Sequence, residues 1–367
     1  MVHDDQSNAY PGKKAHMSRK TGIVKDGRYL QHTAGSAHPE SPERLSAVYE
    51  MLDNPDISWK YTDIVPREAS HDEIAYVHTL PYIEHIAGTA GKSSVILDPD
   101  TMTSPETYEI ARLAVGGVLN AVDAVVTGEV DNAFAFVRPP GHHASASHSA
   151  GFCIFNNVAV GAMHAIRKHG LKNVLIVDWD LHHGNGTQKI FYSDRRVLYF
   201  SSHQYPHYPG TGSLHETGEG DGRGYTVNVP LRQGAVNGTF VSVLRQILAP
   251  IALAYKPELI LVSAGFDTYY QDPLGGMRVT PEGFAAMARI LLNIADACSA
   301  GRMVAVLEGG YHVQGLTRSV KAVVQEMFDE THWTDRKLDE LEQHADEYNK
   351  PVIQSVINVM RPFWNVF

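Results

Sequence analysis

The sequence predicts an α/β protein built on a single, mostly parallel β-sheet with helices on both faces. Short apolar runs of strand length alternate with longer segments of helical periodicity between residues 132 and 307, which is typical of parallel strands joined by helical crossovers. The runs contain few polar residues, as strands buried on both faces require. Several of them end abruptly in Gly, Asp or His, at the place where ligand sites form in open α/β sheets.

The N-terminal third is predicted to contain one strand and several helices. Residues 1–20 are polar and are expected to form a loose arm, and residues 21–24 an edge strand. Ser41 and Pro42 mark the start of a helix that ends near Leu52, because serine is favoured at the N-cap and proline at the first helical position. Further helices are predicted over residues 72–78, 81–87 and 103–127.

From residue 132 onward, strands and helices alternate. The predicted strands are 132–137, 173–177, 197–201, 225–229, 259–263 and 303–307. The predicted helices are 156–169, 236–255 and 281–300. We expect residues 21–330 to form one domain that carries the functional site. The segment 331–367 is charged first and then apolar, which predicts a helical extension that packs on this domain or on a second subunit of a homo-oligomer.

Composition narrows the class of protein. The net charge is −10 and no basic stripe occurs, which argues against direct nucleic-acid binding and allows cationic substrates such as lysine-rich peptides. Two cysteines cannot make a disulfide framework, and the N-terminus lacks the apolar core of a signal peptide, so a reducing cytoplasm is expected. The apolar helix around residues 110–126 is interrupted by Arg112, Asn120 and Asp123, which indicates a core helix and no membrane span.

A dense group of ionisable residues follows the apolar run Val174–Val177. Asp178, Asp180, His182 and His183 occur within six residues, before a Gly-Asn-Gly turn. Asp180 and His182 are two residues apart in an extended segment, so their side chains point to the same side. Oxygen and nitrogen ligands in this arrangement suit a divalent metal such as zinc. The alternative is that the aspartates cap the next helix and the histidines pack in the core.

Three other predicted strand ends carry similar chemistry. They bear the pair His142 and His143, the single Asp267, and Tyr311. A parallel sheet would bring these ends to one edge. Asp180, His182 and Asp267 would then supply three metal ligands and leave one position open for water and substrate, as in catalytic zinc sites.

The motifs around these residues resemble those of the zinc-dependent histone deacetylases. They are Arg138-Pro-Pro-Gly-His-His-Ala144, Gly151-Phe-Cys153 with Asn156-Asn157, Asp178-x-Asp180-x-His182-His183-Gly-Asn-Gly186, Tyr208-Pro-Gly-Thr-Gly212, Asp267 with Asp272-Pro-Leu-Gly275, and Glu308-Gly-Gly-Tyr311. The resemblance covers roughly residues 20–325. Asn185 and the early motif HPESPERL resemble the class II branch, including bacterial histone deacetylase-like amidohydrolases.

This resemblance implies the arginase/deacetylase fold and an enzyme that removes acetyl or other short acyl groups from lysine side chains. It implies one zinc per chain, held by Asp180, His182 and Asp267. The catalytic residues that it implies are His142, His143, Tyr311, Asp178 and Asn185. The substrate-binding residues that it implies are Gly151, Phe152, Tyr208 and Leu274, with Phe152 and Tyr208 as walls of an acyl-lysine tunnel in which the second wall is often Phe.

The same resemblance implies a role for each catalytic residue and a second kind of bound cation. His143, oriented by the neutral Asn185, would act as general base, while His142, bonded to Asp178, would stay cationic and Tyr311 would donate to the oxyanion. The resemblance also implies potassium sites. The inner site would use Asp178 and Ser201 with carbonyls of Asp180, His182 and Ser202, and the outer one lies near Phe191, Val197 and Tyr225.

Three alternatives remain at this point. An acetylpolyamine amidohydrolase would need a rim carboxylate; the expected position is Leu274, which cannot pair with an ammonium, although Asp98 or Asp100 could reach the rim. A binuclear manganese ureohydrolase of the same fold would need carboxylates at positions occupied here by Gly184 and Gly265, so this alternative is rejected. An inactive acyl-lysine-binding module is the alternative from another class, although every catalytic position is filled.

Overall fold

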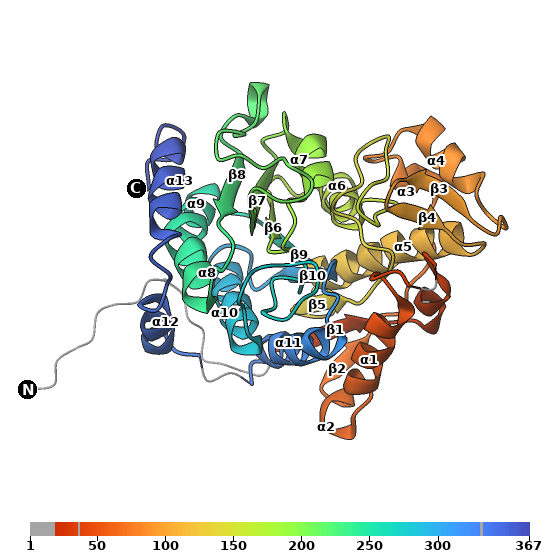
Figure 1. Ribbon diagram of the computed structural model, residues 1–367, viewed down its shortest axis with the longest axis horizontal. Helices are drawn as coiled ribbons and strands as arrows, with labels where there is room; N and C mark the ends of the chain where they lie inside the picture. Colours follow the sequence, from red (N-terminus) through yellow and green to blue (C-terminus); the bar gives the residue numbers. More distant parts are fainter. Residues whose placement is uncertain (1–18, 36, 331–332) are drawn as a thin grey trace, which may run out of the picture.

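The protein is described here by a computed structural model that covers residues 19–35, 37–330 and 333–367. Its centre is an eight-stranded, entirely parallel sheet in the order β2-β1-β5-β10-β9-β6-β7-β8 (Figure 1). The strands are β1 (Thr21–Val24), β2 (Tyr61–Asp63), β5 (Asn132–Ala135), β6 (Val174–Asp178), β7 (Val197–Gln204), β8 (Thr226–Leu231), β9 (Leu259–Ala264) and β10 (Met303–Leu307). The single parallel sheet predicted from the sequence is confirmed. Most of the predicted N-terminal arm, residues 1–18, lies outside the described residues.

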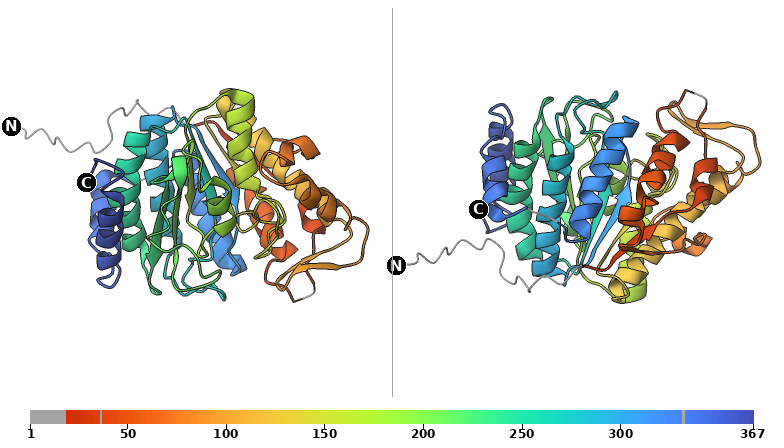
Figure 2. Two further views of the ribbon diagram at one scale, coloured as in Figure 1. Left: turned by 90° about the horizontal axis from the view of Figure 1, so that it is seen from above. Right: turned by 90° about the horizontal axis from the view of Figure 1, so that it is seen from below.

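Helices cover both faces of the sheet (Figure 2). One layer contains α1 (Pro42–Leu52), α8 (Asn237–Val243), α9 (Ala249–Tyr255), α10 (Pro281–Cys298) and α11 (Val313–Met327). The other contains α5 (Thr107–Val126), α6 (Asn157–His169) and α7 (Asn185–Phe191). Beyond α5 lie the short elements α3 (His71–Ile74), α4 (Leu80–Ala87), β3 (Val95–Asp98) and β4 (Thr101–Thr103).

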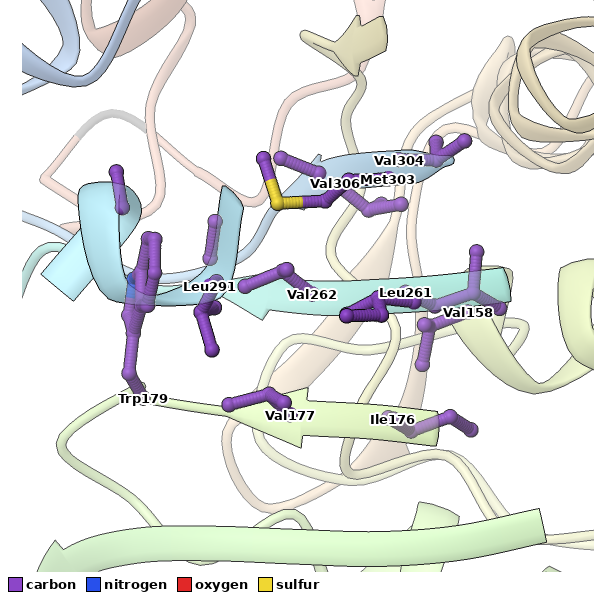
Figure 3. Close-up of a cluster of buried hydrophobic side chains, with 14 of the residues drawn as sticks. Val158, Ile176, Val177, Trp179, Leu261, Val262, Leu291, Met303, Val304 and Val306 are labelled. Atoms are coloured by element: carbon purple, nitrogen blue, oxygen red, sulfur yellow. The ribbon is translucent and has the colours of Figure 1, made fainter. Parts of the chain in front are cut away.

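The core is centred on β6, β9 and β10, whose side chains are buried on both faces (Figure 3). Val158 of α6 and Leu291 of α10 pack against these strands and are fully buried. Trp179, directly after β6, is 1% exposed. Burial of large apolar side chains contributes roughly 1.5–3 kcal/mol each. The strands that end at the predicted site are therefore anchored in the core by buried side chains on both faces.

Two sequence predictions need correction. Residues 21–24 were expected at the sheet edge, but β2 pairs with β1 on its outer side, so β1 is an inner strand with all four residues buried. The three residues of β2 are too few to show a strand pattern. The helix expected over 72–78 is limited to α3, whose end at Ile74 is followed by a turn.

The predicted helix 236–255 is helical throughout but contains a π-turn over Leu244–Leu248, between α8 and α9. Pro250 accounts for this, because proline lacks an N–H and clashes with the carbonyl four residues earlier. By length and composition the segment Asn237–Tyr255 could cross a membrane, but 72% of its most apolar stretch is buried within the protein. Its apolar residues thus belong to the core.

The C-terminal segment covers the other end of the sheet. Its helices α12 (Asp335–Glu342) and α13 (Lys350–Met360) pack on α8 and β8. Asn349 accepts a hydrogen bond from the backbone of Arg232 at 2.8 Å, and Trp364 donates to the carbonyl of Gly224 at 2.9 Å. These contacts protect edge strand β8, which would otherwise offer free backbone groups to other chains.

Candidate active site

The strand order brings the four predicted strand ends together. Strands β5, β10, β9 and β6 are consecutive in the sheet, and all point the same way. Their carboxyl ends lead respectively into His142 and His143, Tyr311, Asp267, and the segment Asp178–His183. This edge is where ligand sites form in open α/β sheets.

Asp180, His182 and Asp267 converge as a candidate metal centre, with one ligand atom of each within 4.8 Å of the others. His182 Nδ1 lies 3.2 Å from Asp180 Oδ1 and 3.0 Å from Asp267 Oδ2. The other carboxylate oxygens accept backbone N–H groups, Asp180 from Gly309 at 2.9 Å and Asp267 from Leu181 at 2.8 Å. The backbone thus fixes both carboxylates and leaves one oxygen of each beside the imidazole.

The electrostatics of this centre favour a cation. Both aspartates are fully buried. Burial and the neighbouring Asp180 raise the pKa of Asp267 to about 7. Burial lowers the pKa of His182, but the two carboxylates outweigh it and raise that pKa to about 10. Buried charges of this kind are stable when paired or bound to a metal, and the N/O donor set fits zinc.

Positions 184 and 265, where a binuclear site would need additional carboxylate ligands, are glycines with no room for a side chain. A Cβ added to Gly265 would lie 2.0 Å from Asp180 Oδ2, and one added to Gly184 would lie 2.2 Å from Asp178 Oδ2. Both distances are far below any van der Waals contact. The carboxylates of a binuclear site therefore cannot be introduced at these positions without rebuilding the centre, which supports the rejection of the ureohydrolase alternative.

The paired histidines differ in their partners and their charge. His142 Nδ1 lies 3.1 Å from Asp178 Oδ2, whereas His143 Nδ1 donates to Asn185 Oδ1 at 2.8 Å, and the ring centroids are 4.0 Å apart. Although burial lowers the pKa of His142, the nearby aspartates raise it to about 10. Burial and the charge of His142 lower the pKa of His143 well below its usual value. The neighbouring carboxylates therefore favour the charged form of His142, whereas burial and the charge of His142 favour the neutral form of His143.

Tyr311 is placed by residues to which the sequence assigned no role. Its backbone N–H donates to Asp272 Oδ2 at 2.6 Å, and the guanidinium of Arg44 lies 4.9 Å from its ring centroid. Arg44 also donates to the carbonyls of Glu308 at 2.6 Å and Gly310 at 2.7 Å. The loop between β10 and Tyr311 is thus tied to α1.

Two buried carboxylates complete this support. Glu40 accepts hydrogen bonds from Arg44 and Arg138, and although burial raises its pKa, Arg138 lowers that pKa below the usual range. Glu308 accepts from the backbone N–H of Gly141 at 2.7 Å and of His142 at 3.2 Å. The sequence does mark Arg138 and Glu308 as charged residues directly after apolar strands. This signal does not reveal which residue each of them contacts.

Aromatic side chains border the metal centre. Phe152 lies 5.8 Å from Tyr311 and Tyr208 lies 5.1 Å from His143, measured between ring centroids. Gly151 has a φ of +55°, and a Cβ there would lie 2.2 Å from the His143 ring, so only glycine fits. Each predicted wall residue therefore packs against one of the reactive side chains, Phe152 against Tyr311 and Tyr208 against His143.

Two histidines to which the sequence assigned no role, His38 and His207, lie beside the aromatic walls and the metal centre. His38 packs edge-on against Phe152 with ring centroids 4.5 Å apart, and His207 stacks on His182 at 5.3 Å. His207 Nε2 donates to the carbonyl of Leu274 at 3.1 Å, which places the half-buried Leu274 close to the metal centre. No strand pattern marks such loop residues in advance.

The predicted inner potassium site stays a prediction. Asp178 lies opposite Ser201 in the register of β6 and β7, and Ser202 is buried beside it. The Ser201 hydroxyl bonds to His203 Nδ1 at 2.9 Å, while Asp178 accepts from the Tyr199 hydroxyl at 3.0 Å.

A sequence profile of the histone deacetylase domain matches residues 38–327. The chain belongs to the histone deacetylase family. It is 42% identical over 297 residues to a probable deacetylase of Archaeoglobus fulgidus, covering 80% of this chain and 82% of that protein. It is 44% identical over 298 residues to polyamine deacetylase HDAC10 of Homo sapiens, covering 78% of this chain and 44% of that protein.

The crystal structure of the HDA15 HD domain resembles this structure with a TM-score of 0.87 at 36% identity, covering 95% of this chain and 96% of that one. These similarities confirm that the chain has the arginase/deacetylase fold and that it is a class II-like member of the family. The chain is therefore a metal-dependent hydrolase that acts on amides. The chain spans less than half the length of HDAC10.

Proposed function

We propose that this histone deacetylase uses zinc to remove acetyl or other short acyl groups from lysine side chains in peptides or proteins. The observation that carries the proposal is the convergence of the ligand set Asp180, His182 and Asp267 with His143 and Tyr311 between two aromatic walls. An aliphatic lysine stem fits between aromatic rings, and its acyl group would end beside the metal centre.

Zinc held by this ligand set would polarise the amide carbonyl and acidify a bound water. His143 is the residue suited to take the water proton, because it is neutral and its Nδ1–H is committed to Asn185. Its Nε2 is then free to accept a proton and to return it to the leaving amine. The neutral Asn185 orients this ring without stabilising its protonated form as a carboxylate would.

His142 and Tyr311 stabilise charge in this scheme. His142 carries a positive charge held by Asp178, so it favours negative charge that develops beside it. Burial raises the pKa of Tyr311 well above its usual value, so the hydroxyl stays protonated and can donate to the oxyanion. Arg44 beneath the ring and the backbone anchor to Asp272 hold this donor in place before substrate binds.

Leu274 supports a peptide substrate over an acetylated polyamine. An apolar side chain beside the rim cannot pair with the distal ammonium of a polyamine, and burying that charge against leucine is unfavourable. It can pack against a peptide backbone or side chain.

The second candidate, acetylpolyamine hydrolysis, is favoured by two carboxylates near the rim. Asp100 accepts a hydrogen bond from the backbone of Gly151 at 3.0 Å, next to the wall residue Phe152. Asp98 ends β3 (Val95–Asp98) two residues before Asp100, and burial and the neighbouring Asp100 raise its pKa. A cationic chain could pair with them if it leaves the tunnel on this side.

A comparison of the two substrates in the wild type separates the two candidates, and the Leu274→Glu variant tests the role of the rim. The wild type should have a higher kcat/KM for an acetyl-lysine peptide than for N8-acetylspermidine. We expect the variant to shift this ratio toward the polyamine by roughly tenfold, equivalent to about 1.4 kcal/mol, because the new carboxylate can pair with the ammonium. The matched control is Leu274→Gln, which has the same length without the charge and should leave the ratio near wild type.

A wild-type preference for the polyamine would overturn the substrate assignment. Binding of acetyl-lysine peptide without any turnover would instead support an inactive acyl-lysine-binding module.

A further inference from the structure

A second group of potential metal ligands lies between α5 and α6, away from the catalytic edge. Asp123 of α5 and His164 and His169 of α6 each offer a ligand atom within 4.8 Å of the others. The Nε2 atoms of His164 and His169 lie 2.8 and 2.6 Å from Asp123 Oδ1. His169 ends α6 shortly before the amino end of β6, so this group lies toward the opposite edge of the sheet from Asp178.

We propose that Asp123, His164 and His169 form a second divalent-metal site that takes zinc or a similar borderline ion and clamps α5 to α6. The donors are one carboxylate and two imidazoles, a set that suits zinc and its neighbours in the transition series. The site is independent of the deacetylation chemistry and adds a second ion to the one expected at the catalytic edge.

The geometry of this group is close to that of the catalytic centre. The contacts from imidazole to carboxylate are 2.6 and 2.8 Å here, against 3.0 and 3.2 Å around His182. Ligands bonded at about 2.0–2.1 Å to a tetrahedral ion lie about 3.3–3.4 Å apart. Both groups therefore need only a small outward movement of their side chains to admit an ion.

The three ligands differ in exposure, so that one side of the site is open to solvent. The side chain of His164 is 1% exposed, that of His169 15% and that of Asp123 26%. An ion can enter from the exposed side, and water can fill its fourth position there. His164 lies deep between the two helices, so an ion bound to all three residues would join α5 and α6.

Lys168 binds the other oxygen of the carboxylate. Its Nζ lies 2.7 Å from Asp123 Oδ2, which leaves Oδ1 for the ion. The lysine charge competes with an ion for this carboxylate and therefore weakens metal binding.

The test is a zinc titration of the holoenzyme, read by metal analysis after equilibrium dialysis. Wild type should hold two zinc ions per chain. His169→Gln, which replaces the partly exposed ligand, should lower the affinity for the second zinc ion by at least about tenfold. It should not change deacetylase activity. Asp123→Asn should do the same. The exposed His85 is a matched control, since His85→Gln should retain both ions.

A further variant distinguishes a metal site from a plain ion-pair cluster. Lys168→Gln removes a competing positive charge and should tighten binding of the second ion. Binding of a single zinc by wild type would overturn the proposal, as would two ions retained in both His169→Gln and Asp123→Asn. Loss of the second ion in Lys168→Gln would show that the assigned ligand set is wrong.

Discussion

Replacing His143 with alanine should lower kcat by roughly 10²–10⁴-fold, the contribution typical of a general base. The variant lacks the neutral imidazole whose Nδ1–H is held by Asn185, so no residue remains in place to accept the water proton. The metal ligands Asp180, His182 and Asp267 are unchanged. Metal content should therefore equal that of the wild type while turnover of an acetyl-lysine peptide collapses.

His148 offers a matched control for this variant. It lies in the same loop but is exposed, so His148→Ala should retain nearly normal turnover. If His143→Ala kept its turnover within a factor of about ten of wild type, below the usual range for such a base, the assignment of the base would be wrong. If it lost both turnover and metal, the ring would have a structural role in the metal centre.

Replacing Tyr311 with phenylalanine should lower kcat by roughly 10²–10³-fold, as removal of one oxyanion donor does. The ring keeps its packing on Phe152 and Arg44, so the wall and the loop should remain in place. Because the hydroxyl acts on charge that develops during the reaction, the effect should fall on kcat more than on KM.

Tyr270, which is 49% exposed, provides the control for loss of a phenolic hydroxyl, and Tyr270→Phe should behave like wild type. A Tyr311→Phe enzyme with unchanged kcat would show that the oxyanion is stabilised elsewhere. A change confined to KM would indicate a role in substrate binding only.

The sequence was sufficient to predict the sheet and the convergence of the candidate site residues at one edge, because their signals are local. Asp180 and His182 follow directly on an apolar strand, and Asp267 and Tyr311 follow others, so strand polarity alone places them at one edge. Strand β2 could not be predicted, since three residues carry no periodicity. The π-turn before Pro250 likewise depends on how one helix relieves a local clash.

The buried ion pairs and hydrogen bonds that hold the site residues could not be predicted from sequence patterns. Glu40 meets Arg138 across 98 positions of sequence, and Arg44 reaches Gly310 across 266. Asp123 was interpreted only as a polar interruption in an apolar helix. Its histidine partners lie 41 and 46 positions away, and nothing in the local pattern pairs them. Such contacts depend on how elements distant in sequence pack together.

The most direct test of the central claim is removal and restoration of the metal. After dialysis against a chelator, the protein should be inactive on an acetyl-lysine peptide and still folded, because Asp180 and Asp267 keep their backbone hydrogen bonds without the ion. The account predicts that one equivalent of zinc at the catalytic centre restores turnover. Full activity in the metal-free protein, or no recovery on adding zinc to folded protein, would contradict it.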